Sequence, residues 1–132
     1  MNIHISTTAL LLGVAKADEI IDSNELESIQ NIIMNFFQIS KKESIAVINN
    51  AKEHLKDSTD LYQFCKEINN KFNYQKKIKF ILSIYEIAFC DQNLHYLEDH
   101  VIKQIANLLH VEHHDLIESK LEIKKNVKLK NF

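Results

Sequence analysis

The sequence predicts an all-α fold, a single compact bundle of about seven helices that includes two similar helical hairpins. Three observations lead to this class. The 132 residues contain no proline and one glycine, whereas strand-rich folds need such turn residues. Apolar residues recur three and four positions apart through seven segments, which is the spacing of one face of an α-helix. A short block also occurs twice, so one pair of helices is expected to recur.

The repeated block joins the two helices of each hairpin. Residues 15–25, AKADEIIDSNE, align with residues 88–98, AFCDQNLHYLE, at a constant offset of 73 residues (91 − 18 = 98 − 25). In each copy an apolar helix ends near an aspartate, Asp18 or Asp91. A short loop follows, and a second apolar helix opens with a glutamate in its first turn. This duplicated acidic loop is the one place in the chain where chemistry is expected.

The first hairpin is predicted to begin with a helix over residues 6–18, for which Ser6 or Thr7 can serve as the N-cap. Its second helix opens at Asp22, with Glu25 three residues later, which is the spacing of a capping box. The two side chains of such a box accept backbone N–H groups that the first helical turn leaves unpaired. The inward-facing residues are Leu10, Leu11, Val14 and Ala17 in the first helix and Leu26, Ile29, Ile32, Ile33, Phe36 and Phe37 in the second.

Two further helices connect the hairpins. Ser40 and Glu43 form another capping box at the start of the third helix, and Ser58 or Thr59 can cap the fourth. Both helices carry apolar residues at helical spacing, so each is expected to bury one face. The inward-facing residues are Ile45, Ile48 and Leu55 in the third helix and Leu61, Phe64, Cys65, Ile68 and Phe72 in the fourth.

The second hairpin begins at Asn73, which can cap the fifth helix. Apolar residues cover much of the circumference of this helix, so it is predicted to be the central one. The sixth helix is predicted to begin near His95 or Tyr96, and the seventh near Glu112. The inward-facing residues are Ile78, Ile81, Leu82, Tyr85 and Ala88, then Leu97, Val101, Ile102, Ile105, Leu108 and Leu109, then Leu116, Ile117 and Leu121.

Length and composition bound the class of protein. One helical domain is predicted over residues 1–132, with a core over about 5–120 and a lysine-rich tail over 121–132. The net charge of −2 and the absence of arginine argue against nucleic-acid binding. No secretory signal and no run of about 18 apolar residues occurs, so the protein is not expected to span a membrane. Cys65 and Cys90 lie on apolar helical faces, as reduced core thiols of a cytoplasmic protein do.

The acidic loops suggest a divalent-cation site. If the two hairpins pack as a pseudo-twofold pair, carboxylates from both loops converge and repel one another unless a cation lies between them. Carboxylates suit Mg²⁺, Ca²⁺ or Mn²⁺, and a histidine shifts the preference toward Mn²⁺, Fe²⁺ or Zn²⁺. The candidate ligands are Asp18, Asp22, Glu25, Asp91, His95 and Glu98.

Helix capping is the other interpretation of the same residues. Asp22 with Glu25, and His95 with Glu98, stand at capping-box spacing, and the loop aspartates can accept N–H groups of the loop itself. The spacing is not that of an EF-hand. The remaining histidines are expected at exposed helix ends, and Gly13 is predicted where two helices approach closely. No nucleophile motif or phosphate-binding glycine loop occurs, so an enzyme is not expected.

These residues resemble the TerB family, named for bacterial tellurite-resistance proteins. The family signature is Ala-x-x-Asp-Gly-x-Ile/Leu-x-x-x-Glu near both ends of an all-helical domain, and residues 15–25 and 88–98 match it. Glu19 and Gln92 replace the glycine of the signature, so these loops need not adopt the turn that glycine favours. The resemblance covers about residues 5–120 and implies a compact helical bundle.

The resemblance also implies a function. It suggests a cytosolic stress-response or adaptor domain that binds protein partners, with a membrane-bound complex as one setting. Metal binding through the acidic residues, suggested for the family, adds to the case for a cation. Two alternatives belong to other classes, namely a small metalloenzyme with a carboxylate and histidine centre, and a purely structural bundle that serves oligomerisation. The bundle-type Glu-x-x-His motif is absent, since the order here is His95-x-x-Glu98.

Overall fold

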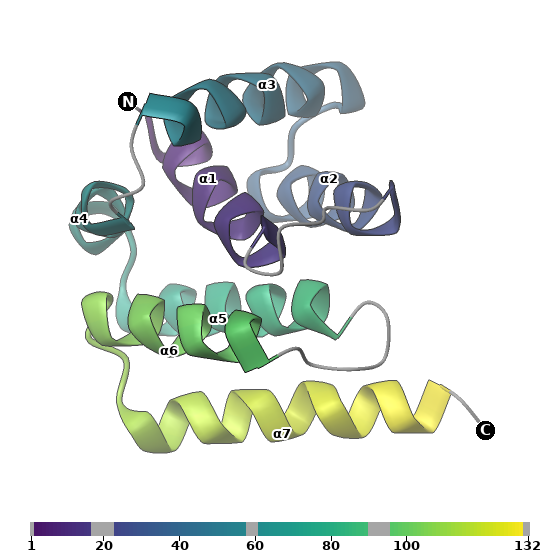
Figure 1. Ribbon diagram of the computed structural model, residues 1–132, viewed down its shortest axis with the longest axis vertical. Helices are drawn as coiled ribbons and strands as arrows, with labels where there is room; N and C mark the ends of the chain where they lie inside the picture. Colours follow the sequence, from purple (N-terminus) through teal and green to yellow (C-terminus); the bar gives the residue numbers. More distant parts are fainter. Residues whose placement is uncertain (1, 17–22, 58–60, 90–95, 131–132) are drawn as a thin grey trace.

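Seven α-helices make up most of the part of the chain that the structure describes (Figure 1). The structure, a computed structural model, describes residues 2–16, 23–57, 61–89 and 96–130. No strand occurs within these four ranges, so the predicted all-α bundle of seven helices is confirmed. None of the helices described there is long and apolar enough to cross a bilayer. The helices are α1 (Ile3–Ala15), α2 (Ser23–Phe37), α3 (Lys41–Asp57), α4 (Leu61–Lys71), α5 (Tyr74–Ala88), α6 (Tyr96–Leu108) and α7 (His113–Lys130).

The central helix is α1, so the prediction that the fifth helix is central is wrong. α1 packs against α2, α3, α4, α5 and α6, and Figure 1 shows it between α3 and the pair formed by α5 and α6. Its buried residues run round the whole helix, as in the consecutive Leu10, Leu11 and Leu12. By contrast, α5 is amphipathic, because Lys76 and Lys79 give it an exposed polar side.

The start of α1 also differs from the prediction. α1 begins at Ile3, because the side chain of Asn2 accepts a hydrogen bond from the Ile5 N–H at 2.9 Å. The predicted caps, Ser6 and Thr7, are instead buried inside the helix. Asparagine is as good an N-cap as serine, and the apolar spacing that locates the helix carries no signal for its first turn.

Two other predicted caps are confirmed. The side chain of Ser40 accepts from the Glu43 N–H at 3.1 Å, and the Glu43 carboxylate accepts from the Ser40 N–H at 3.5 Å, so these residues form a capping box. Asn73 accepts from the Lys76 N–H at 2.8 Å and starts α5. The predicted caps that lie outside the described residues are Asp22, Ser58, Thr59 and His95.

The single glycine, Gly13, does not mark a close approach of two helices. A methyl group on its Cα would meet the Cδ2 atom of Leu61 at 3.7 Å, which is an ordinary van der Waals contact. The predicted close approach at Gly13 is therefore wrong, since α1 and α4 are far enough apart there to accept a small side chain.

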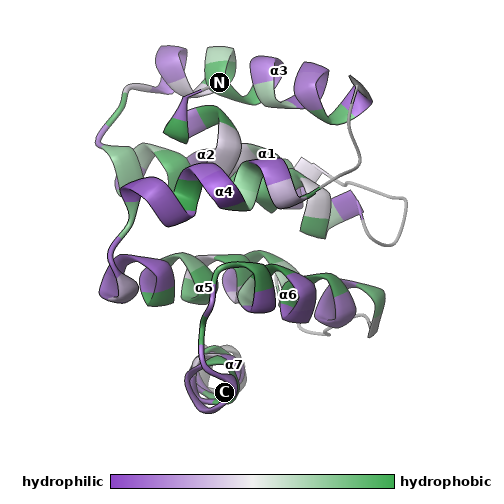
Figure 2. Ribbon diagram, turned by 90° about the vertical axis from the view of Figure 1, so that its left-hand side faces the viewer, coloured by the Kyte–Doolittle hydropathy of each residue, from purple (hydrophilic) through white to green (hydrophobic). Residues whose placement is uncertain are grey.

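The duplication extends beyond the hairpins to units of three helices. α1, α2 and α3 pack against one another, and α5, α6 and α7 do the same. In this duplication α1 corresponds to α5, and α2 corresponds to α6. Between the units α1 contacts α6, and the equivalent pair, α5 and α2, is also in contact. α4 belongs to neither unit and bridges α1 and α6. Figure 2 shows the resulting layers, with α3 at one end of the bundle and α7 at the other.

The two units share the turn between their second and third helices. Gln38, after α2, has φ 54°, and His110, after α6, has φ 59°. In each turn the next N–H, of Ile39 or Val111, donates to the carbonyl five residues earlier, at 3.2 and 2.9 Å respectively. A left-handed residue followed by this bond is a Schellman motif. Because glycine usually occupies the left-handed position and neither turn contains it, the sequence does not reveal this part of the repeat.

Candidate functional sites

Two of the six candidate metal ligands lie in the described residues. Glu25 is half-buried in the first turn of α2, and Glu98 is only 4% exposed in the first turn of α6. These are equivalent positions in the two units, as the repeat predicts. The candidate ligands outside the described residues are Asp18, Asp22, Asp91 and His95.

The described carboxylates fit a hard cation in ligand type but do not form a site by themselves. Within the four described ranges, no group of three or more His, Cys, Asp or Glu side chains is placed to hold a metal ion. Carboxylate oxygens are the ligands that Mg²⁺, Ca²⁺ and Mn²⁺ prefer. Each glutamate also lies at a helix N-terminus, where a negative charge is favourable without any metal. Both interpretations of the repeat are therefore consistent with the positions of Glu25 and Glu98.

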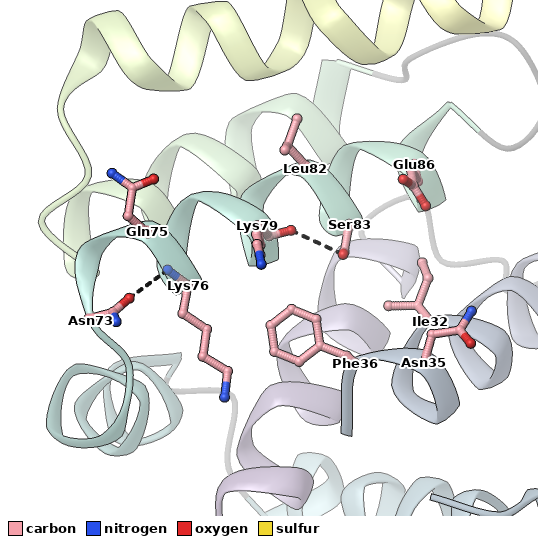
Figure 3. Close-up of a pocket in the computed structure, with 10 residues that line it drawn as sticks. All are labelled: Ile32, Asn35, Phe36, Asn73, Gln75, Lys76, Lys79, Leu82, Ser83 and Glu86. Carbon is pink, nitrogen blue, oxygen red and sulfur yellow. Dashed lines mark hydrogen bonds between the residues drawn. The ribbon is translucent and has the colours of Figure 1, made fainter. Parts of the chain in front are cut away.

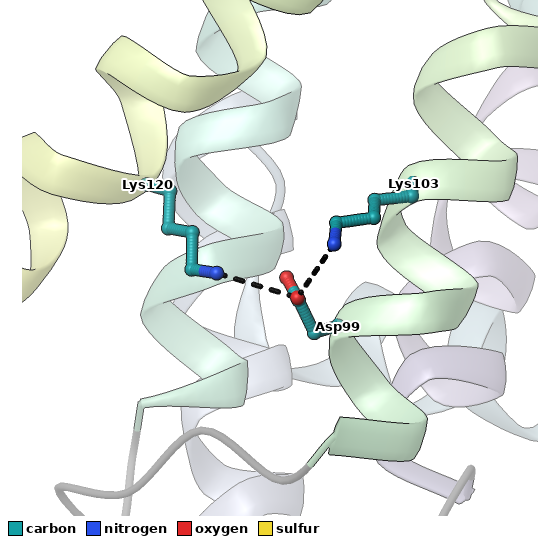
Figure 4. A network of polar contacts seen from close by, with 3 residues as sticks. All are labelled: Asp99, Lys103 and Lys120. Carbon is teal, nitrogen blue, oxygen red and sulfur yellow. Dashed lines mark hydrogen bonds and ion pairs between the residues drawn. The ribbon is translucent and has the colours of Figure 1, made fainter.

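An acidic residue next to Glu98 connects α6 to α7 (Figure 4). The Oδ2 atom of Asp99 lies 3.2 Å from the Lys103 ammonium, one turn along α6, and 3.3 Å from the Lys120 ammonium on α7. The side chains of Asp99 and Lys120 are 15% and 27% exposed, so solvent screens this pair less than a surface pair. The other oxygen, Oδ1, is buried and accepts no hydrogen bond from the residues that the structure describes.

Tyr85, on α5, is close enough to Asp99 for the charge of that carboxylate to affect its pKa. Its side chain is buried, and its hydroxyl group finds no hydrogen-bond partner in the described parts of the chain. Burial, followed by the negative charge of Asp99, raises the pKa of Tyr85 far above the ordinary value of 10.0. The hydroxyl therefore keeps its proton at any physiological pH and remains a hydrogen-bond donor.

The structure shows the positions of two histidines and of one cysteine. His110 occupies the left-handed position after α6, and His114 pairs with Glu118 at 3.0 Å on the exposed side of α7. Cys65 is buried in the core, as predicted, whereas Cys90 lies outside the described residues.

A groove lies between α2 and α5 (Figure 3), and the sequence does not predict it. Its volume is about 660 Å³, within the range of ligand-binding clefts. Apolar side chains of both helices line it together with a polar stripe from α5. That polar stripe, at helical spacing on a helix that the sequence predicts to be central, is the signal that could have revealed the groove. The lining residues are Ile32, Asn35, Phe36, Asn73, Gln75, Lys76, Lys79, Leu82, Ser83 and Glu86.

The aromatic core positions the groove. The ring of Phe36 lies 5.7 Å from that of Phe72 and 6.3 Å from that of Phe80, and the latter two rings are also 6.3 Å apart. The Lys76 ammonium lies 4.8 Å from the Phe72 ring centroid and 5.7 Å from that of Phe36. At these distances the ammonium is attracted to both ring faces, and Figure 3 shows the Lys76 side chain beside Phe36.

Fold and site together define an all-α domain built from two three-helix units, each with a glutamate in the first turn of its second helix. The family model of the tellurite resistance protein TerB matches residues 4–121 of the 132. The chain therefore belongs to the TerB family. No curated protein and no solved structure matches it.

Proposed function

We propose that this chain is a cytosolic adaptor domain of the TerB family that binds protein partners as part of a stress response. The groove between α2 and α5 is the observation that supports protein binding. It has an apolar floor and polar rims, the composition of surfaces that dock protein segments. The cytosolic and stress-response parts of the proposal rest on the cysteine usage and on the family. The proposal assigns no catalytic residue.

Photo-crosslinking in the native host tests the proposed adaptor role. A benzoylphenylalanine replaces Asn35, which lines the groove, and in a matched control it replaces Asn126, an exposed asparagine on α7. Crosslinks to another protein from position 35 and not from position 126 are expected. The same crosslinked species from both positions, or none from position 35, would contradict partner binding in the groove.

A divalent cation at the duplicated acidic loops is the second proposed function. The repeat supports it, because Glu25 and Glu98 occupy equivalent helix starts and carboxylate oxygens are the ligands that such ions prefer. Asp18, Asp22, Glu25, Asp91 and His95 would complete the ligand set, with Mg²⁺, Ca²⁺, Mn²⁺ or Zn²⁺ as the ion. Such an ion would fix the geometry of the hairpins and so support the domain that presents the groove.

Thermal unfolding of chelator-treated protein tests this second proposal, with each of the four ions added separately. An ion that binds only the folded state raises stability by about 2.7 kcal/mol at a hundredfold excess over its Kd. The shift should saturate, and Asp18→Ala combined with Asp91→Ala should abolish it. A matched pair of exposed sites, Glu53→Ala with Glu118→Ala, should leave it intact. A flat response to all four ions would limit the acidic residues to helix capping.

A further inference from the structure

The shape of the α2–α5 groove suits a helical segment. It runs along α5 from Asn73 to Glu86, a distance of about 20 Å at 1.5 Å per residue. That length exceeds a compact small molecule and matches a peptide. Both walls are α-helices, whose backbone groups are already paired within the helix, so an added β-strand would find no partners. A bound segment must therefore pack through its side chains, which is how an amphipathic helix docks.

The floor of the groove offers an apolar contact for such a segment. Ile32 and Phe36 from α2 and Leu82 from α5 are partly buried, and all three pack against the hydrophobic core. A helix that docks here can bury apolar side chains spaced three and four residues apart. The exposed parts of these three residues would leave water at the same time.

The charged side chains of the groove indicate the charge of the segment that it would bind. Lys76 and Lys79 stand three residues apart on α5, so their ammonium groups lie on one side of the helix. No ion pair joins either lysine to a carboxylate in the described part of the chain. Both lysines line the groove from the N-terminal half of α5, and Figure 3 shows Glu86 toward the other end of the helix. Charge complementarity therefore favours acidic groups against this half of the groove.

We propose that the groove binds an acidic amphipathic helix of another protein. Its apolar side chains, spaced i, i+3 or i+4 and i+7, would pack on Ile32, Phe36 and Leu82, and its aspartates or glutamates would pair with Lys76 and Lys79. The inference rests on the proposed adaptor function and adds the chemistry of the ligand. The absence of arginine and the net charge of −2 make an extended polyanion such as RNA a poor fit.

A displayed library of random peptides tests the proposal, because selection from it does not require an identified partner. The library holds segments of about 16 residues, long enough to span the groove as a helix. It is selected on the full-length wild-type chain and, in parallel, on the Lys76→Glu plus Lys79→Glu variant. The control variant is Lys124→Glu plus Lys125→Glu, two exposed lysines on α7 whose reversal changes the net charge by the same amount. Circular dichroism confirms that each variant keeps its helices.

Acidic sequences with apolar residues at helical spacing should be enriched on the wild type and on the α7 control. Against the groove variant, their Kd should rise at least about tenfold, because like charges would then oppose one another. If the double variant does not fold, the single variant Lys79→Glu takes its place in the selection. In that variant the Lys76 ammonium keeps its contacts with the Phe36 and Phe72 rings.

The contradicting outcomes separate the two proposals. Groove-dependent enrichment of basic or non-helical peptides would overturn the acidic helix but keep a protein-binding groove. Equal enrichment on all variants, or none at all, would overturn the groove as a site for a helical peptide. Crosslinks from position 35 would then still show whether another protein binds at the groove in a different way. A crosslink from position 35 to a second copy of this chain, recognised by its mass, would overturn the proposal. The groove would then be an interface between two copies of the chain.

Discussion

At the scale of single residues, glycine and left-handed backbone occur at different positions of this chain. Gly13 lies within α1, whereas Gln38 and His110 hold left-handed positions in the described residues. Glycine inside a helix costs about 1 kcal/mol relative to alanine, and a side chain in left-handed backbone costs a similar amount. Replacing glycine in the helix, or introducing it at a left-handed position, should therefore stabilise the fold.

Gly13→Ala should stabilise the fold by about 1 kcal/mol. The added methyl group meets Leu61 at an ordinary contact distance, so no clash offsets the gain in helix propensity. Chemical denaturation of the two proteins measures the difference. A loss of stability would mean that the added methyl group does not fit beside the Leu61 side chain.

His110→Gly should also stabilise the fold, again by about 1 kcal/mol, because glycine adopts positive φ without strain. The equivalent Gln38→Gly should gain less, since the Gln38 side chain donates a hydrogen bond to the Asn35 carbonyl at 2.7 Å, which glycine cannot make. The same denaturation assay compares both variants. An equal gain at both positions would show that this side-chain bond contributes nothing.

At the scale of helices, α5 holds the start of α7 through one tyrosine. The Tyr74 hydroxyl donates a hydrogen bond to the Asp115 carboxylate and accepts one from the Glu112 N–H at 3.1 Å. The bond to Asp115, together with partial desolvation, raises the pKa of Tyr74 above its ordinary 10.0. A raised pKa means that the folded state holds this proton more tightly than the unfolded state does.

The contribution of Tyr74 to stability should therefore be complete below pH 10 and should decrease as the pH rises beyond it. Denaturation at several pH values between about 8 and about 11 gives the free energy of unfolding of the wild type and of Tyr74→Phe. The difference between the two measures the contribution of Tyr74, because both proteins contain the same lysines and their titration cancels. The two curves should converge at the alkaline end. A constant difference across the range would contradict a role for the phenolic proton.

Helix positions follow from the sequence where apolar spacing and a capping side chain agree. Ser40 and Asn73 are such cases, and both predicted starts are observed. The start of α1 is missed because capping residues occur at Asn2 as well as at Ser6, and spacing alone does not choose between them. The Schellman turn at His110 is missed because its usual glycine is replaced.

At the scale of the molecule, the position of α1 predicts the order in which the fold opens. In the described residues α1 contacts five other helices, namely two of each unit and the bridging α4, whereas α7 packs mainly on α5 and α6. Amides of α1 should therefore exchange with solvent only through global unfolding, and those of α7 through smaller openings. Hydrogen exchange read by mass spectrometry should show the strongest protection over residues 3–15. Faster exchange there than in α7 would contradict the central role of α1.

The candidate sites differ in how far the sequence predicts them. The repeat correctly places Glu25 and Glu98 at equivalent helix starts, because aligned sequence positions occupy equivalent positions in the two units. The groove depends on how α2 lies against α5, a tertiary arrangement that no local pattern specifies. Phe36 illustrates the difference, since its spacing predicts burial but not that its ring lines an open groove beneath Lys76.

The equivalent contacts of the two three-helix units suggest how such a fold can arise from a smaller chain. A chain of one unit could rebuild most of this core by pairing with an identical copy, since α1 would meet its counterpart as it now meets α5. Such a pair would separate on dilution. Fusion of two units through a segment such as α4 makes their interface intramolecular, so the assembled core no longer depends on the abundance of the protein.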